Sequence, residues 1–147
     1  RHQVVAEYRA ALQLTGDAGR GRKVFSQYCI SCHKVGEEGS EIGPTLSTVK
    51  ARSPESILIQ ILDPNRELLA NYMQYFVTLE DGRTVSGQIV HESSSSLTMR
   101  RAGGVEETIF RKTIKLITSS EKSLMPEGLE AVISHQAMSD LIAFLRN

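Results

Sequence analysis

The sequence predicts an α+β protein in which a mostly α domain carries a small antiparallel β module as an insertion. Apolar residues recur at helical spacing over 3–14, 17–28, 54–62 and 135–146. Between residues 72 and 118 the period changes to two, and turn-forming pairs divide this stretch into five short runs. A chain of 147 residues is normally one domain, or one domain with a sizeable insertion, and we expect the second arrangement.

The composition argues against several classes of protein. Lys and Arg balance Asp and Glu at 17 each, so nothing in the charge favours a nucleic acid or a membrane surface as partner. No apolar run approaches the ~18 residues of a membrane span, and we recognise no signal peptide in this chain. Because the chain begins at Arg1 rather than Met, we expect a mature form or an excised piece of a longer protein.

The first two helices lead to the most informative motif. The helix at 3–14 is amphipathic, and Asp17 is the expected N-cap of a second helix of about ten residues. This second helix turns Gly21 and Phe25 inward and ends at Cys29. Gly21 either allows another helix to approach closely or simply lies near a helix start, and both interpretations stay open.

Cys29, Cys32 and His33 form a CxxCH motif, which is typical of c-type haem attachment. Each thiol can add to one vinyl group of a porphyrin, and the adjacent histidine can then ligate the iron. A lone CxxCH also occurs in zinc sites and redox pairs. We expect one covalent haem c per chain, attached through both cysteines, which leaves no cysteine for a disulfide.

Gly43 and Pro44 follow in a glycine-rich stretch without helical or strand periodicity. A metal-ligating histidine usually donates its second ring N–H to a carbonyl or carboxylate, which fixes its tautomer. The carbonyl of Pro44 is our candidate for this partner of His33. The alternative is an ordinary Gly-Pro turn.

The β module should be a small curled sheet or a partly closed barrel of the SH3-like kind. Asp81-Gly82 is a strong hairpin signal, and Gly87 indicates a bulge or sharp bend. The expected strands are 75–80, 85–91, 97–99, 105–110 and 114–118.

A group of basic residues accompanies the later strands of this module. They form either a docking surface for an acidic redox partner or an ordinary solvated face. The group comprises Arg100, Arg101, Arg111, Lys112 and Lys115.

The last segment returns to helix. Ser123-Leu124-Met125-Pro126 reads as a loop, and Ser134 is the expected N-cap of a final helix from about His135 to Arg146. Its buried stripe would comprise Met138, Leu141, Ile142 and Leu145.

Together these elements resemble class I cytochrome c: a helix entering CxxCH, then Gly-Pro-x-Leu, a Met-Pro loop and a closing helix. The resemblance implies that Pro44 and Leu46 contact the haem. It also implies that the terminal helices cross at a glycine and an aromatic residue, which Gly21, Phe25 and Phe144 match. The resemblance is closer still to the putative haem-binding domain of the Pirellula/Verrucomicrobium type. That likeness covers about 17–147 and rests on the stretches 62–66, 78–82 and 123–129.

The resemblance also implies a division of the chain. Residues 1–16 would be the tail of a preceding region, because this domain commonly ends long exported proteins that carry a dehydrogenase-like propeller and helical repeats. Residues 17–71 and 119–147 would be the two halves of the cytochrome, and 72–118 the insertion. Because c-type haem is attached outside the cytoplasm, we expect an exported or periplasmic protein.

The sixth iron ligand must come from elsewhere in the chain. Met125 is the best candidate because it precedes Pro126 on a loop, although it lies 92 residues after His33. Met138 and Met99 fit a helix core and a sheet core, whereas Met73, just before the first strand, stays open. The conceivable histidine replacements are His91 and His135, and His2 near the start of the chain is not expected to take part.

These features predict an electron carrier rather than an enzyme. A His/Met-ligated haem would relay electrons from a fused or partner dehydrogenase to a downstream cytochrome or respiratory oxidase. The alternative is a haem-based gas or redox sensor, or a small haem enzyme, with an open or weakly held sixth coordination site.

Overall fold

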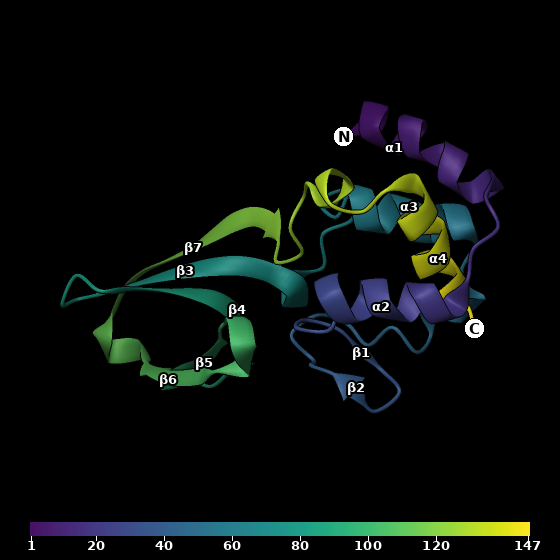
Figure 1. Cartoon of the computed structure of the whole chain (residues 1–147). Coiled ribbons are helices and arrows are strands. Elements are labelled where there is room, and N and C mark those ends of the chain that lie inside the picture. The colour runs from purple at the N-terminus through teal and green to yellow at the C-terminus, as the bar shows by residue number, and fades with distance from the viewer.

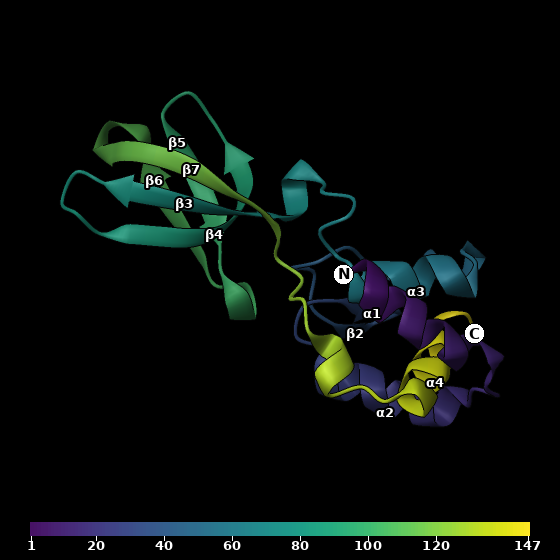
Figure 2. The same cartoon turned by 90° about the horizontal axis from the view of Figure 1, so that it is seen from above.

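The computed structural model describes the backbone of residues 1–147 and every side chain except that of Ala102. A helical domain contains both chain termini, and a curled β-sheet projects from one side of it (Figures 1 and 2). The helices are α1 (His2–Tyr8), α2 (Ala18–Tyr28), α3 (Pro54–Leu62) and α4 (His135–Leu145). The strands are β1 (Lys34–Val35), β2 (Glu38–Gly39), β3 (Met73–Leu79), β4 (Thr84–Glu92), β5 (Ser96–Arg100), β6 (Glu106–Phe110) and β7 (Ile114–Ser123). None of the described helices has the length and hydropathy needed to cross a bilayer.

The helices begin where the sequence predicts. The side chains of Asp17, Ser53 and Ser134 each accept a hydrogen bond from the first turn of α2, α3 and α4, so all three predicted N-caps are confirmed. The predicted helix at 3–14 is partly wrong, because α1 ends at Tyr8 and the chain continues as a 3-10 segment over Arg9–Gln13.

Helices α2 and α4 cross at a glycine, as the resemblance implied. A Cβ added at Gly21 would lie only 1.9 Å from the carbonyl oxygen of Asp140, and one added at Gly16 would lie 2.4 Å from that of Ser139. The rings of Phe25 and Phe144 pack at the same crossing, with centroids 5.5 Å apart. Gly21 therefore has the close-approach role, since any side chain here would separate the two helices.

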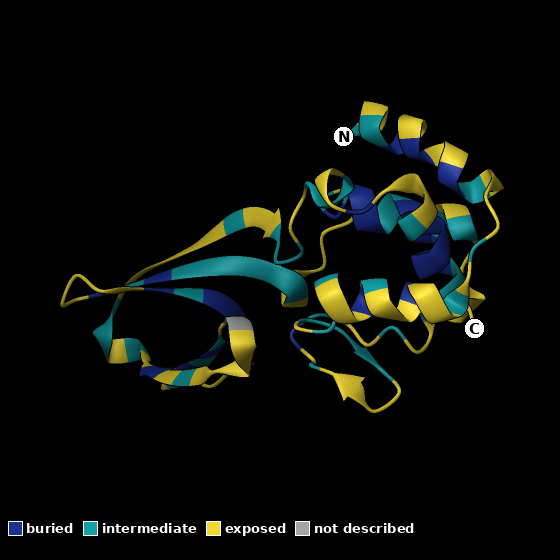
Figure 3. Ribbon diagram, in the orientation of Figure 1, coloured by how far each residue is buried: buried dark blue, intermediate teal, exposed yellow. Residues whose placement is uncertain are grey.

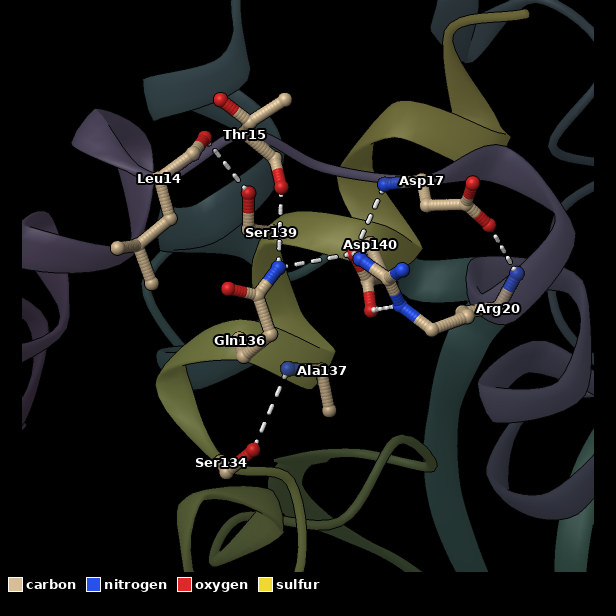
Figure 4. A network of polar contacts seen from close by, with 9 residues as sticks. All are labelled: Leu14, Thr15, Asp17, Arg20, Ser134, Gln136, Ala137, Ser139 and Asp140. Atoms are coloured by element: carbon tan, nitrogen blue, oxygen red, sulfur yellow. Dashed lines mark hydrogen bonds and ion pairs between the residues drawn. The ribbon is translucent and has the colours of Figure 1, made fainter.

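Polar contacts reinforce this crossing (Figure 4). The carboxylate of Asp140 on α4 accepts hydrogen bonds from the backbone N–H of Asp17 at 2.8 Å and from Nε of Arg20 at 2.7 Å. Gln136 donates to the same carboxylate and to the carbonyl of Thr15, each at 3.0 Å. These contacts fix the start of α2 on α4.

Residues 1–16 belong to the helical core in this structure. Val5, Tyr8 and Ala11 are buried, and the exposed residues of α1 face away from the other helices (Figure 3). Their burial partners include Phe25, Ile57, Leu58, Ile61, Leu62, Ile133, Met138, Leu141, Ile142 and Leu145. The predicted stripe of α4 is thus confirmed, and the first helix packs on the domain that follows it.

The β module is a five-stranded antiparallel sheet in the order β6-β5-β4-β3-β7. Strand β4 pairs with β3 through Gly87 and with β5 from Gln88 onward, so Gly87 lies at the predicted bend. A closed barrel is not seen, because the described pairings leave β6 and β7 as the two edges. The sheet has its own core of Val77, Leu79, Val85, Leu97, Met99 and Ile109.

The strands differ most from the prediction in two places. Strand β7 runs on to Ser123, five residues beyond the predicted end at Thr118, and its pairing with β3 extends to Met73↔Ser123. The short hairpin β1–β2, in the stretch predicted to be irregular, is held by only two residue pairs. Neither segment has the alternating apolar pattern by which strands are recognised in a sequence.

Candidate haem site

The CxxCH motif forms a tight turn at the C-terminal end of α2. The backbone N–H of Cys29 donates to the Phe25 carbonyl at 2.9 Å. The backbone N–H groups of Cys32 and His33 donate to the Cys29 carbonyl at 3.1 and 2.9 Å. Both thiols are free and half-buried. Two thiols and an imidazole are therefore presented on a single turn that the helix anchors.

The imidazole of His33 is oriented by the carbonyl of Pro44. Nδ1 of His33 lies 2.8 Å from this oxygen, so the N–H is on Nδ1 and the lone pair of Nε2 is available to a metal. Burial lowers the pKa of His33, while the hydrogen bond to Pro44 opposes that shift. A neutral imidazole with a free Nε2 is the form that ligates iron.

Two glycines make room for this histidine. A Cβ added at Gly43 would lie 2.6 Å from Cε1 of the His33 ring, and one added at Gly39 would lie 2.0 Å from the His33 carbonyl oxygen. Gly39 also has a φ of +104°, which side chains rarely adopt. A glycine-rich stretch in a sequence indicates a loop but does not reveal what each glycine contacts.

The loop itself is tied to the motif by backbone hydrogen bonds. The N–H of Gly43 donates to the Cys32 carbonyl at 2.7 Å, and the N–H of Leu46 donates to the Lys34 carbonyl at 2.8 Å. Leu46 is half-buried against the helical core. The Gly-Pro-x-Leu stretch thus packs beside CxxCH.

The thiol of Cys29 is in an apolar setting. Burial, with a smaller contribution from Cys32, raises its pKa to about 11. The group is therefore a neutral thiol at neutral pH, which is compatible with a packed interior position.

Met125 lies on the loop between β7 and the 3-10 segment Leu129–Ala131, half-buried against the helical core. Met99 is fully buried in the sheet core and Met138 in the helical core, as predicted. Met73 is half-buried at the start of β3 and is the Cα partner of Ser123 in the ladder, so its backbone lies close in space to the start of the Met125 loop.

The candidate histidines are exposed. His135 stacks on the ring of Tyr8 with centroids 4.2 Å apart, which assigns it a packing contact. His91 lies on β4 of the sheet, and His2 lies on α1. His91 and His135 are therefore surface residues, as predicted, and His2 is exposed as well.

Most of the basic group on the sheet is paired with carboxylates. Arg100 lies 2.7 Å from Glu106, and Arg101 lies 3.3 Å from Glu107. Arg111 lies 4.0 Å from Glu92. The predicted basic docking surface is therefore largely neutralised, which favours the solvated face.

The residues present fit a haem. Two thiols and an imidazole with free Nε2 are the donor set that covalent attachment and axial ligation need, and a thioether is available on a separate loop. Half-buried apolar side chains border the same core, namely Tyr28, Leu46, Val49, Ile59 and Leu129. Such side chains suit the apolar ring of a porphyrin.

Two comparisons with known proteins agree with this site. The cytochrome c family profile matches residues 18–84, which include CxxCH and Pro44. A "Cytochrome c-553-like" protein of Synechocystis sp. (strain PCC 6803) is 35% identical over 79 residues, covering 46% of this chain and 74% of that relative.

Proposed function

The chain belongs to the cytochrome c family, and on this premise we propose that its haem is attached through Cys29 and Cys32 and is ligated by His33 and Met125. As a c-type cytochrome, the protein binds haem iron and transfers electrons. The bound iron would supply the redox chemistry by gaining and losing one electron. The protein residues have the tasks of attachment, orientation and exclusion of water.

The observation that carries this proposal is the hydrogen bond between His33 and Pro44. It fixes the tautomer with Nε2 free, on the same turn as the two thiols. Gly39 and Gly43 allow this arrangement to be tightly packed, so the ring would ligate without reorienting. Low reorganisation on changing oxidation state is what an electron carrier needs.

Met125 is the proposed sixth ligand because its loop borders the same helical core as Cys29 and Leu46. Thioether ligation raises the reduction potential relative to a second histidine. The alternative function, a haem sensor or small haem enzyme, would need a vacant or weakly held sixth position. Catalysis at that position would also need a distal acid or base, and His91 and His135 are both surface residues.

The wider context is also a proposal. We place the protein outside the cytoplasm, relaying electrons from a fused or partner dehydrogenase to a respiratory acceptor. The closeness to the Pirellula/Verrucomicrobium type supports this context through the stretches 62–66, 78–82 and 123–129. In the same proposal, residues 72–118 are an insertion between two halves of the cytochrome.

A potentiometric titration followed by visible spectroscopy tests the function. We expect one reversible one-electron transition, and a ferrous protein that binds CO poorly. Met125→Ala should lower the potential and allow rapid CO binding. If the ferrous wild type binds CO readily and Met125→Ala changes neither property, the His/Met assignment is wrong.

A further inference from the structure

The side chain of Asn65 spans the Met125 loop. Its Oδ1 accepts a hydrogen bond from the backbone N–H of Ser123 at 2.8 Å. Its Nδ2 donates to Oε1 of Glu127 at 2.6 Å. The two contacts lie two residues before and two residues after Met125, so one amide group joins both arms of the loop.

Asn65 itself is on a fixed element. It follows α3 in a turn in which the N–H of Arg66 donates to the Asp63 carbonyl at 3.1 Å, and the neighbouring Pro64 is buried. Leu62, at the end of α3, is fully buried. The loop is thus attached through Asn65 to the helical core.

An amide side chain is suited to make both contacts, because its oxygen accepts and its nitrogen donates. The N–H of Ser123 requires an acceptor, and the carboxylate of Glu127 requires a donor. An aspartate would keep the first bond and place a second negative charge beside Glu127. Asparagine is therefore matched to both arms of the loop.

Other contacts position the same loop but do not span Met125. The N–H of Leu124 donates to the Tyr72 carbonyl at 2.9 Å, at the base of the sheet. The N–H of Met125 donates to Oγ of Ser123 at 3.1 Å. These bonds act on the first arm of the loop, whereas Asn65 joins the first arm to the second.

We propose that Asn65 is a positioning residue that keeps Met125 directed at the haem iron. The inference rests on the proposed His/Met ligation. It assigns a role to the turn after α3 in holding a ligand that lies 60 residues further along the chain. The two hydrogen bonds of Asn65, to Ser123 and to Glu127, are called the clamp below. Loss of this clamp should favour an open loop, in which the thioether leaves the sixth position more often.

CO binding to the ferrous haem-loaded protein measures that opening. For Asn65→Ala we expect the observed CO association rate to rise about tenfold, since one to two hydrogen bonds to charged or backbone partners are lost. Glu127→Ala should give a smaller rise in the same direction. Asn71→Ala is the matched control, because the structure describes no hydrogen bond from the Asn71 side chain.

Met125→Ala sets the upper limit of the CO association rate. It also distinguishes failure of the proposed ligation from failure of the proposed role of Asn65. If Met125→Ala itself leaves CO binding unchanged, the proposed ligation fails. If Met125→Ala speeds CO binding but Asn65→Ala and Glu127→Ala match the wild type, the ligation stands and the clamp is rejected. A loss of thermal stability in Asn65→Ala without faster CO binding would also overturn the proposal. Glu127 is exposed, so Glu127→Ala can be tested even if Asn65→Ala does not fold.

Discussion

The carbonyl oxygen of Pro44 lies 2.8 Å from Nδ1 of His33. This contact sets the tautomer of the imidazole and leaves Nε2 as the only nitrogen with a free lone pair. It also joins the loop after CxxCH to the motif itself. The prediction that the Pro44 carbonyl is the partner of His33 is thus confirmed by the geometry.

Gly43→Ala tests how tightly this histidine is packed. The new Cβ would lie 2.6 Å from Cε1 of His33, so the ring must tilt or the loop must move. We expect a lower yield of covalently attached haem and a shifted Soret band in the protein that forms. Gly19→Ala is the control, because its Cβ would meet only the end of the Asp17 side chain, at 3.3 Å, and its φ is not positive. Identical spectra and haem yields for Gly43→Ala and Gly19→Ala would contradict the prediction.

Gly21→Ala tests the helix crossing. Its Cβ would lie 1.9 Å from the Asp140 carbonyl, and this backbone atom cannot yield without separating α2 from α4. We expect the free energy of unfolding to fall by about 3 kcal/mol, measured by urea denaturation. Gly19→Ala, on the same helix, meets only the end of the Asp17 side chain at 3.3 Å and should be close to neutral. Equal stabilities of the two variants would argue against the close approach.

Acid should weaken the same crossing through Asp140. Hydrogen bonding to Arg20 lowers the pKa of Asp140 to about 2, even though burial alone would raise it. The stabilisation is therefore complete above the unfolded pKa of about 4 and is lost as the pH falls towards 2. It amounts to ~2 kcal/mol.

Asp140→Asn removes this titration. Its free energy of unfolding should be lower than that of the wild type at pH 6 and should change less between pH 4 and pH 2, as followed by far-ultraviolet circular dichroism. Glu130, whose pKa is lowered chiefly by hydrogen bonding to Arg1, would account for part of the remaining slope. A wild-type slope that persists unchanged in Asp140→Asn would exclude Asp140 as its source.

Tyr8→Phe tests whether α1 stabilises the end of the Met125 loop. The Tyr8 hydroxyl lies 2.8 Å from both the Glu130 and the Ile133 carbonyl oxygens. Its removal should cost about 1–2 kcal/mol of unfolding free energy, measured with urea. Retention of wild-type stability would show that these hydroxyl contacts contribute little to the stability of the domain.

Local sequence signals predicted the helices and the motif well. Asp17, Ser53 and Ser134 act within one turn of their own position, so their capping roles follow from the neighbouring residues alone. The change of period at the β module reflects burial on one face, which is also a local property. The end of β7 was missed because Ser119–Ser123 is polar and pairs through its backbone.

The remaining parts of the site depend on contacts between distant residues. Asn65 meets Ser123 and Glu127 across 58 and 62 positions, and no local pattern reveals such a pair. The glycines at 39 and 43 have their reason in the histidine that they contact, which only the folded chain shows. The basic residues of the sheet are a further case. The sequence suggests a basic docking surface, whereas in the structure Arg100 and Arg101 are paired with carboxylates of the neighbouring strand.

The most direct test of the central claim is the near-infrared spectrum of the ferric protein, where thioether ligation gives a charge-transfer band. We expect the band in the wild type and in Met73→Ala, and its loss in Met125→Ala. A band that survives in Met125→Ala but disappears in Met73→Ala would assign the sixth ligand to Met73. Absence of the band from the wild type would contradict His33/Met125 ligation altogether.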